Sequence, residues 1–188
     1  MEKGTVLFSK KGKENRPKFQ EGIKMKYNKI RKMDIANGPG VRVSVFLQGC
    51  EFHCKNCFNP ETWDFAGGEE FTDETIEKVL KACDKEYIEG LSILGGEPMH
   101  PKNIEGTTKL AKAFKEKFPN KNLWAWSGFT YEKYLKGKEI LNYLDVLVDG
   151  QYVDELHNPT LKWRGSSNQR VINIPKTLKK NEVVLEEK

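Results

Sequence analysis

Segments with the two-residue period of a β-strand alternate with segments that have the 3.6-residue period of an amphipathic helix along most of this chain. At residues 41–47, for example, Val41, Val43 and Val45 alternate with polar neighbours before two further apolar residues, which is a strand pattern. Because strands alternate with helices, we expect right-handed βαβ units and a mostly parallel sheet. The expected strands lie at 41–47, 91–94, 122–126, 144–148 and 170–174, and the expected helices at about 73–87, 103–118 and 130–136.

The length of the chain limits how such a sheet can close. A complete eight-fold βα barrel typically needs ~250 residues, and this chain has 188. We therefore expect an α/β fold of the partial (open) βα barrel type. Ligands of such folds gather at the carboxyl ends of the parallel strands. In this sequence those ends carry Gly49-Cys50, Gly95-Gly96-Glu97, Ser127-Gly128 and Asp149-Gly150.

The formal net charge of +5 is unevenly distributed. Residues 1–24 carry seven basic and three acidic side chains, so the rest of the chain has a net charge of only +1. We expect residues 1–24 to be a flexible basic extension and residues 25–188 to be a single domain. One hypothesis is that the extension comes from an upstream start codon and that Met25 opens the domain.

This distribution weakens the case for a nucleic-acid binder, because the basic excess lies in the extension. The sequence has no apolar run of the length that a membrane span requires. The extension also lacks the apolar core of a secretory signal peptide. We therefore expect a cytoplasmic protein that binds neither membrane nor nucleic acid.

Three of the four cysteines, Cys50, Cys54 and Cys57, form a C-x3-C-x2-C segment directly after a predicted strand. Structural zinc sites and ferredoxin clusters normally take four protein ligands. Here a fourth ligand would have to be His53, inside the loop, or the distant Cys83, whose place on an apolar helix face favours core packing. Three thiolates would leave one iron of a [4Fe–4S] cluster open to a non-protein ligand, as in a catalytic cluster. Structural zinc and free thiols in a reducing cytosol stay open as alternatives.

Four further stretches extend this motif into a family resemblance. C-x3-C-x2-C followed by Gly-Gly-Glu-Pro at 95–98 is similar to the radical S-adenosylmethionine enzymes. DIANGPGVR at 34–42, CFNPETW at 57–63 and WRGSSNQ at 163–169 narrow this to the activating proteins of anaerobic (class III) ribonucleoside-triphosphate reductases. The resemblance covers about residues 25–174.

The resemblance implies the cofactors, the reaction and the partners. Cys50, Cys54 and Cys57 would hold a [4Fe–4S] cluster as its metal ligands and catalytic residues, and S-adenosylmethionine would bind the fourth iron. One electron, from reduced flavodoxin or a similar donor, would cleave S-adenosylmethionine to methionine and a 5′-deoxyadenosyl radical. That radical would take a hydrogen atom from a glycine of the large subunit of the reductase, leaving a glycyl radical.

The resemblance also implies which residues bind S-adenosylmethionine. The loop of Gly95, Gly96 and Glu97 would bind its methionine amino group, although an isolated Gly-Gly-x-Pro is as often a plain turn. Ser127 and Asp149 end later strands and could line the same pocket, or could instead hydrogen-bond neighbouring loops.

The adenine contact departs from the usual pattern. Many members of the superfamily have an aromatic residue just before the third cysteine, and this chain has Asn56 there. Asn56, Cys57 and Phe58 are the expected cofactor-binding residues of this stretch, and Phe58 or His53 could supply the missing ring. His53 could equally be an exposed loop residue.

Three other features have open interpretations. Residues 163–169 combine aromatic, arginine and small polar residues, and we expect them to help dock the reductase or its glycine loop; an ordinary surface loop is the alternative. The turn at 37–40 and the adjacent Arg42 have a cofactor or partner role by resemblance alone. Trp124 and Trp126 share one face of a strand and are expected to pack in the core or at its rim.

Two other kinds of protein remain alternatives. One is a radical S-adenosylmethionine enzyme that acts on a small molecule or a nucleobase, which would need an enclosed pocket. The other is a zinc-stabilised binding module without catalysis. A protein substrate instead favours a partial barrel whose active site is open on one side.

Overall fold

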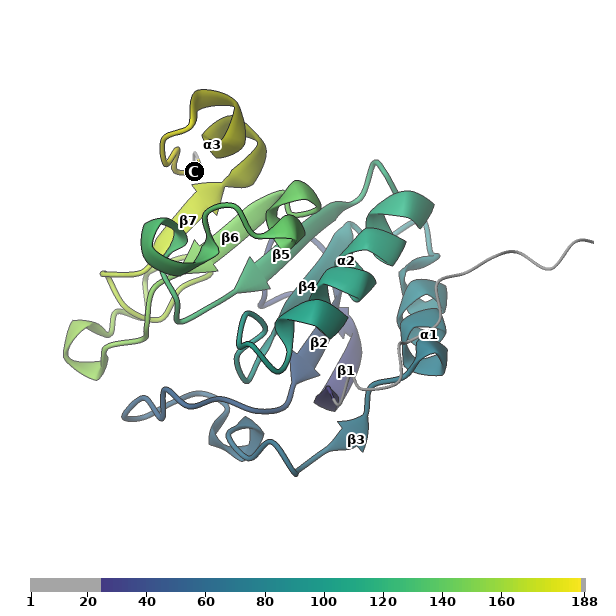
Figure 1. Ribbon diagram of the computed structural model, residues 1–188, viewed down its shortest axis with the longest axis horizontal. Coiled ribbons are helices and arrows are strands. Elements are labelled where there is room, and N and C mark those ends of the chain that lie inside the picture. The colour runs from purple at the N-terminus through teal and green to yellow at the C-terminus, as the bar shows by residue number, and fades with distance from the viewer. Residues whose placement is uncertain (1–24, 187–188) are drawn as a thin grey trace, which may run out of the picture.

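The computed structural model describes residues 25–186 and contains one seven-stranded sheet with helices packed against it (Figure 1). The prediction for residues 1–24 lies outside the described residues, and the single-domain boundary stays a prediction. The strands are β1 (Lys26–Asp34), β2 (Arg42–Leu47), β3 (Glu69–Glu70), β4 (Gly90–Gly95), β5 (Asn122–Trp126), β6 (Val146–Asp149) and β7 (Arg170–Asn173). The α-helices are α1 (Asp73–Cys83), α2 (Ile104–Lys117) and α3 (Ile174–Lys180). Short 3₁₀ turns lie at Pro60–Thr62, Glu139–Asn142 and Asp154–Leu156, and a π-helical turn at Tyr131–Leu135.

The sheet has the order β3-β1-β2-β4-β5-β6-β7. The pairs β2–β4, β4–β5 and β5–β6 are parallel, whereas β1 and β7 pair with their neighbours in antiparallel orientation. The expectation of an α/β fold with an open sheet is therefore confirmed, and the parallel character belongs to its middle strands. The parallel strands all end at one edge, which receives the predicted site residues.

Side-chain alternation divides the sheet into two faces. One face carries buried aliphatic residues that pack under α1 and α2, which lie side by side over the sheet in Figure 1. Thr72 caps the N-terminus of α1, and its backbone N–H donates to the Thr75 hydroxyl at 3.2 Å. Cys83 is fully buried within this core, which confirms its predicted packing role.

The opposite face of the sheet carries aromatic residues. Trp124 is buried and Trp126 half-buried beside it, and the chain returns at Trp163 to cover them. Trp163 lies edge-on to Trp124 with ring centroids 4.9 Å apart, and the Trp126 indole N–H donates to the Trp163 carbonyl at 2.7 Å. Trp124 and Trp126 therefore have the packing role expected of them.

Arg42 is the first residue of β2, lies over the Trp124 ring on this face, and is fully buried. It donates to the Ser92 hydroxyl at 2.7 Å and to the Pro39 carbonyl at 3.2 Å, and Ser92 donates to the Asn37 carbonyl at 2.6 Å. The 37–40 turn is thus fixed to the sheet at the start of β2, at the end opposite Cys50. Burial lowers the pKa of Arg42 to about 10.

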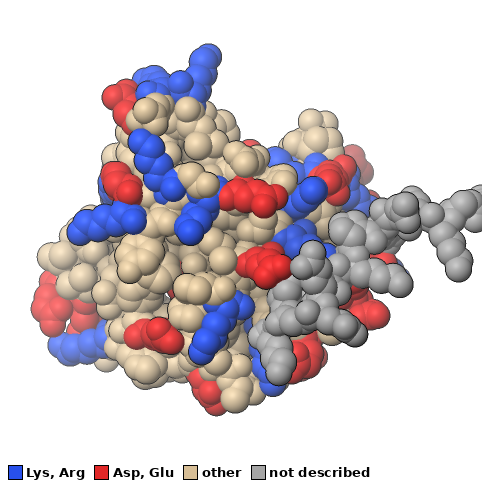
Figure 2. All heavy atoms as spheres, in the orientation of Figure 1, with Lys and Arg blue, Asp and Glu red and all other residues tan. Residues whose placement is uncertain are grey.

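The surface of the described residues mixes charges of both signs. On the face shown in Figure 2, Lys and Arg side chains are interspersed with Asp and Glu, and neither sign dominates that view. In residues 25–186 no helix has the length and hydropathy needed to cross a bilayer.

Candidate active site

A pocket lies at the carboxyl edge of the parallel strands and has about 670 Å³ of space, including its mouth. The loop after β2, the β4–α2 connection, the end of β5 and the segment after β6 all contribute to its lining. Eight of the ten residues expected to form the site line it together: Cys50, Cys54, Cys57, Phe58, Gly95, Gly96, Glu97 and Ser127. Asn56 and Asp149 lie outside this lining.

The cysteine loop (residues 50–57) is anchored at its start and turns sharply within. Cys50 donates its backbone N–H to the Trp63 carbonyl at 3.0 Å, and Cys57 donates to the Cys54 carbonyl at 3.2 Å. His53 and Asn56 have φ values of 45° and 54°, a left-handed conformation that is uncommon outside glycine. These turns bring Cys50, Cys54 and Cys57 to one pocket wall.

The wall that holds the three cysteines has N–H groups close to two of the sulfurs, as suits a metal group bound by thiolates. The Asn59 backbone N–H lies 3.4 Å from the Cys57 sulfur, and the Gln151 side-chain amide lies 3.5 Å from the Cys54 sulfur. Hydrogen bonds of this kind stabilise ligating thiolates. Within residues 25–186 the sulfurs do not form a tight, preassembled metal-binding cluster. The donor set fits, and metal binding would draw the sulfurs together.

Cys50 is held as a thiol in this arrangement. Its burial raises the pKa of the thiol to about 11, against opposing hydrogen bonds from the Phe52 and His53 backbone N–H groups. Metal binding would therefore release a proton from Cys50. His53 is exposed and packs its ring on Trp63 at a centroid distance of 4.7 Å, away from the pocket lining.

The 95–97 loop packs directly on the end of β2. Gly95 has φ 103°, and a Cβ placed there would lie 2.8 Å from the Leu47 nitrogen. A Cβ on Gly96 would lie 2.6 Å from the Gly49 carbonyl oxygen. Two backbone hydrogen bonds, Gly96 N–H to the Leu47 carbonyl at 2.9 Å and Glu97 N–H to the Gly49 carbonyl at 2.8 Å, complete this junction. Both glycines therefore let the backbone of this loop lie close to the end of the neighbouring strand.

The Glu97 carboxyl group joins this loop to the end of β5. It is buried and accepts hydrogen bonds from the Met99 N–H at 2.8 Å, the Ser127 hydroxyl at 2.8 Å and the Gly128 N–H at 2.7 Å. Burial outweighs these hydrogen bonds and raises the pKa of Glu97 to about 7. Ser127 thus has a defined partner at the pocket wall, and its contact with a cofactor stays a prediction.

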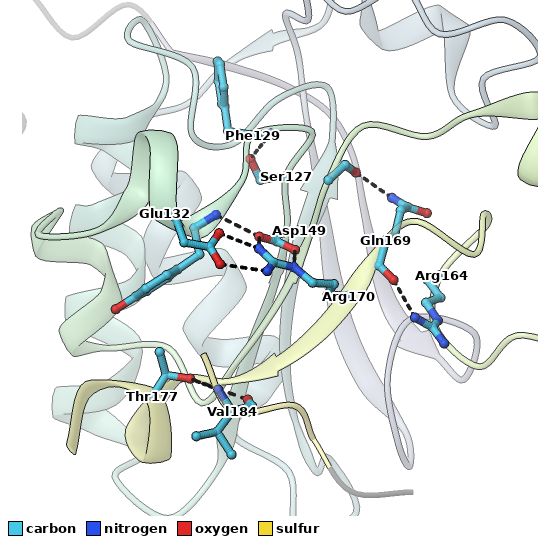
Figure 3. A network of polar contacts seen from close by, with 11 residues as sticks. Ser127, Phe129, Glu132, Asp149, Arg164, Gln169, Arg170, Thr177 and Val184 are labelled. Carbon is cyan, nitrogen blue, oxygen red and sulfur yellow. Dashed lines mark hydrogen bonds and ion pairs between the residues drawn. The ribbon is translucent and has the colours of Figure 1, made fainter. Parts of the chain in front are cut away.

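Asp149 is fully buried and belongs to the polar network of Figure 3. Its carboxylate accepts from the Tyr131 N–H at 2.8 Å and from Arg170 at 2.9 and 2.6 Å. Arg170 also makes two hydrogen bonds to Glu132, at 2.8 and 2.7 Å. This is the alternative foreseen for Asp149, hydrogen bonding to neighbouring segments, whereas its role in the pocket stays a prediction.

The candidates for the adenine contact occupy different positions. Phe58 lines the pocket and is 68% exposed, with its ring against Tyr152 at a centroid distance of 5.6 Å. Asn56 points elsewhere and donates to the Asp154 carboxylate at 2.9 Å. The position of Phe58 in the pocket lining fits an adenine contact, and the choice between Phe58 and His53 stays a prediction.

Residues 163–169 belong to a second wall of the pocket, which they reach through Gln169. The Gln169 side chain organises them: it accepts from the Gly165 N–H at 2.9 Å and the Ser166 N–H at 3.2 Å, and donates to the Gly150 carbonyl at 2.9 Å. Gln169 also lines the pocket, while Ser167 is exposed. The segment is thus a folded wall with an exposed tip, and its predicted docking role stays untested.

Several residues of the site were not predicted from the sequence, and three of them make defined contacts there. Tyr152 lines the pocket, Gln151 reaches the Cys54 sulfur, and the Asn103 amide contacts the junction between the cysteine loop and the 95–97 loop. Asn103 is the first residue of the amphipathic helix predicted over about 103–118, and asparagine is common at helix starts, so that signal could have drawn attention to it. Nothing in the local sequence distinguishes the other two.

Comparison with known proteins agrees with this site. Residues 36–172 match the model of a family described as a 4Fe-4S single cluster domain. The chain is 42% identical over 148 residues to the anaerobic ribonucleoside-triphosphate reductase-activating protein of Enterobacteria phage T4, covering 78% of this chain and 93% of that protein. Proteins of the same name from Vibrio cholerae (38% over 148 residues; 77% and 96% covered) and Escherichia coli K12 (35% over 153 residues; 80% and 99% covered) are also similar.

Proposed function

The chain belongs to the family of anaerobic ribonucleoside-triphosphate reductase-activating proteins, and from this premise we propose that it is the enzyme that activates such a reductase by reductive cleavage of S-adenosylmethionine. The observation that carries the proposal is the shared pocket. Three cysteines and the 95–97 loop, which are far apart in the sequence, line one space at the carboxyl edge of the sheet.

In this proposal Cys50, Cys54 and Cys57 hold a [4Fe–4S] cluster, and S-adenosylmethionine occupies the space between them and the 95–97 loop. The bound cluster would supply one electron that breaks the sulfonium–C5′ bond, giving methionine and a 5′-deoxyadenosyl radical. Transfer of a hydrogen atom from a reductase glycine to that radical gives 5′-deoxyadenosine and a glycyl radical. Reduced flavodoxin or a similar donor would provide the electron.

The chain's own residues bind and orient the reactants. The Asn59 N–H and the Gln151 amide donate to cysteine sulfurs, which favours the thiolate form needed for ligation. The Glu97 carboxyl group fixes the 95–97 loop to Ser127 and Gly128 and so shapes the wall on which S-adenosylmethionine rests. Phe58 and Tyr152 place aromatic surface at the pocket, suited to exclude water from a reactive intermediate.

The test combines the anaerobically reconstituted protein with its candidate reductase, S-adenosylmethionine and a strong reductant. We expect about four iron atoms per chain, release of 5′-deoxyadenosine, and a glycyl radical signal in the reductase by electron paramagnetic resonance (EPR). Cys54→Ala should abolish the cluster and the radical. Cys83→Ala, a matched control in the helix-packed core, should retain both.

Each alternative gives a different outcome. A colourless protein that binds zinc and no iron would contradict the proposal and favour a structural zinc module. Release of 5′-deoxyadenosine with no radical on the reductase would favour a radical enzyme that acts on another substrate.

A further inference from the structure

The side chain of Asn103 lies at the point where the cysteine loop and the 95–97 loop meet. Asn103 is 1% exposed and comes directly before α2. Its Nδ2 atom lies 3.0 Å from the Gln48 carbonyl oxygen, 3.0 Å from the Glu97 carbonyl oxygen and 3.5 Å from the Gly49 carbonyl oxygen. One buried amide therefore contacts the backbone of both segments.

The three carbonyls belong to the residues that set the position of the pocket walls. Gln48 and Gly49 immediately precede Cys50, and Glu97 ends the 95–97 loop. The backbone hydrogen bond from Glu97 N–H to the Gly49 carbonyl connects the same two segments. Among the described residues, Asn103 is the only one whose side-chain amide donates hydrogen bonds to both segments.

The side chain is not occupied by the helix that Asn103 begins. As the residue before α2 it makes no side-chain capping hydrogen bond. Its backbone serves the helix instead, because its carbonyl accepts from the Thr107 N–H at 2.9 Å. The amide group is therefore free to hold the two loops.

We propose that Asn103 is a positioning residue that sets the offset between Cys50 and the 95–97 loop, and through it the placement of S-adenosylmethionine relative to the cysteine-bound metal. The inference rests on the proposed function, since it concerns the same pocket. Its physical basis is the sensitivity of reactions to alignment: misplacement by about 1 Å can cost a hundredfold in rate.

The nature of the amide suggests two informative substitutions. Asn103→Asp keeps the shape but replaces the N–H donors by a carboxylate that faces three carbonyl oxygens, so the loops should be pushed apart. Asn103→Ala removes the contact without adding charge and keeps the test valid if the aspartate variant does not fold. Asn173→Asp is the matched control, because Asn173 begins α3 and its Oδ1 accepts from the Lys176 N–H at 2.9 Å, at the opposite end of β6 from the pocket.

The experiment measures cluster content, and the S-adenosylmethionine concentration that half-saturates the change in the EPR spectrum of the reduced cluster. Both Asn103 variants should assemble the wild-type amount of iron and sulfide. Their half-saturating concentration should rise about tenfold or more, with an altered spectrum at saturation, while Asn173→Asp behaves as wild type. A thermal melt of the apo protein checks the fold of each variant.

Other outcomes separate the inference from the proposed function. A folded Asn103→Ala with wild-type half-saturation and spectrum would overturn the inference alone. Loss of cluster assembly in a folded Asn103→Ala would also overturn it, because the amide would then act on the cysteine loop by itself. A wild-type protein whose cluster spectrum does not respond to S-adenosylmethionine would overturn the proposed function.

Discussion

At the scale of single residues, Glu97 places a carboxyl group where ionisation is unfavourable. The group is buried, and its burial raises the pKa from 4.5 to about 7 despite three hydrogen-bond donors. The folded chain therefore holds a proton that the unfolded chain releases near pH 4.5. Stability from this group is present below pH 4.5 and is lost as the pH rises through about 7.

We expect the free energy of unfolding of the apo protein to fall by about 3 kcal/mol between pH 4.5 and pH 7 because of Glu97. Glu97→Gln, which cannot ionise, should lose this part of the pH dependence. Denaturant unfolding at four pH values measures it, with exposed Glu116→Gln on α2 as the control. A Glu97→Gln variant that keeps the wild-type slope would show that Glu97 is ionised throughout this range.

At the scale of elements, the strands and helices that could be predicted are those marked by a pattern within their own residues. The buried middle strands were recognisable because aliphatic residues dominate them, as at Leu91 and Ile93. β1 was missed because its nine residues, KYNKIRKMD, are mostly polar, and its place in the sheet depends on antiparallel pairing with β2. The helix expected over 130–136 is a π-helical turn, and the helix expected to reach about residue 87 ends at Cys83.

The same distinction applies to the site. The cysteines and the 95–97 loop were predictable because short spacings and glycines define them along the chain. The contacts of Asn103 reach 55 residues back to Gln48, and Arg170 meets Asp149 and Glu132, which lie 21 and 38 residues away. Such pairings follow from how the strands are ordered in the sheet, and no local pattern encodes them.

The pairing of Glu132 with Arg170 ties the π-helical turn to β7, as Figure 3 shows. The Arg170 guanidinium lowers the pKa of Glu132 to about 2. The ion pair therefore stabilises the fold above pH 4.5, and this contribution is lost as the pH falls towards 2. Because the Glu132 side chain is 53% exposed, solvent screening limits the contribution to about 1 kcal/mol.

Glu132→Gln should accordingly lower the free energy of unfolding by about 1 kcal/mol at pH 7. The difference from wild type should shrink as the pH approaches 3. Chemical unfolding between pH 3 and pH 7 measures this, with exposed Glu182→Gln as the control. A difference that stays constant over this range would mean that the ionised pair is not its source.

At the scale of the whole molecule, the open sheet leaves the pocket accessible between two walls. The cysteine loop forms one wall, and the segment 163–169 belongs to a second wall, which it reaches through Gln169. The aromatic cluster of Trp124, Trp126 and Trp163 fixes the second wall to the sheet, while Ser167 at its tip is exposed. An arrangement of this kind suits a protein substrate whose glycine-bearing loop enters between the walls and completes the enclosure of the site.

If that loop enters there, a bulky charge at the tip of the second wall should slow hydrogen transfer from the reductase glycine. It should leave the cleavage of S-adenosylmethionine unchanged. We expect Ser167→Arg to reduce glycyl radical formation in the reductase about tenfold, within the range that single interface residues contribute. The release of 5′-deoxyadenosine without reductase should stay at the wild-type rate, because the Ser167 side chain lies outside the pocket lining. Asn120→Arg, in the exposed turn between α2 and β5, adds the same charge at the other end of the sheet and should change neither. Equal loss of both activities in Ser167→Arg would place the effect on the pocket itself, and unchanged radical yield would place the docking surface elsewhere.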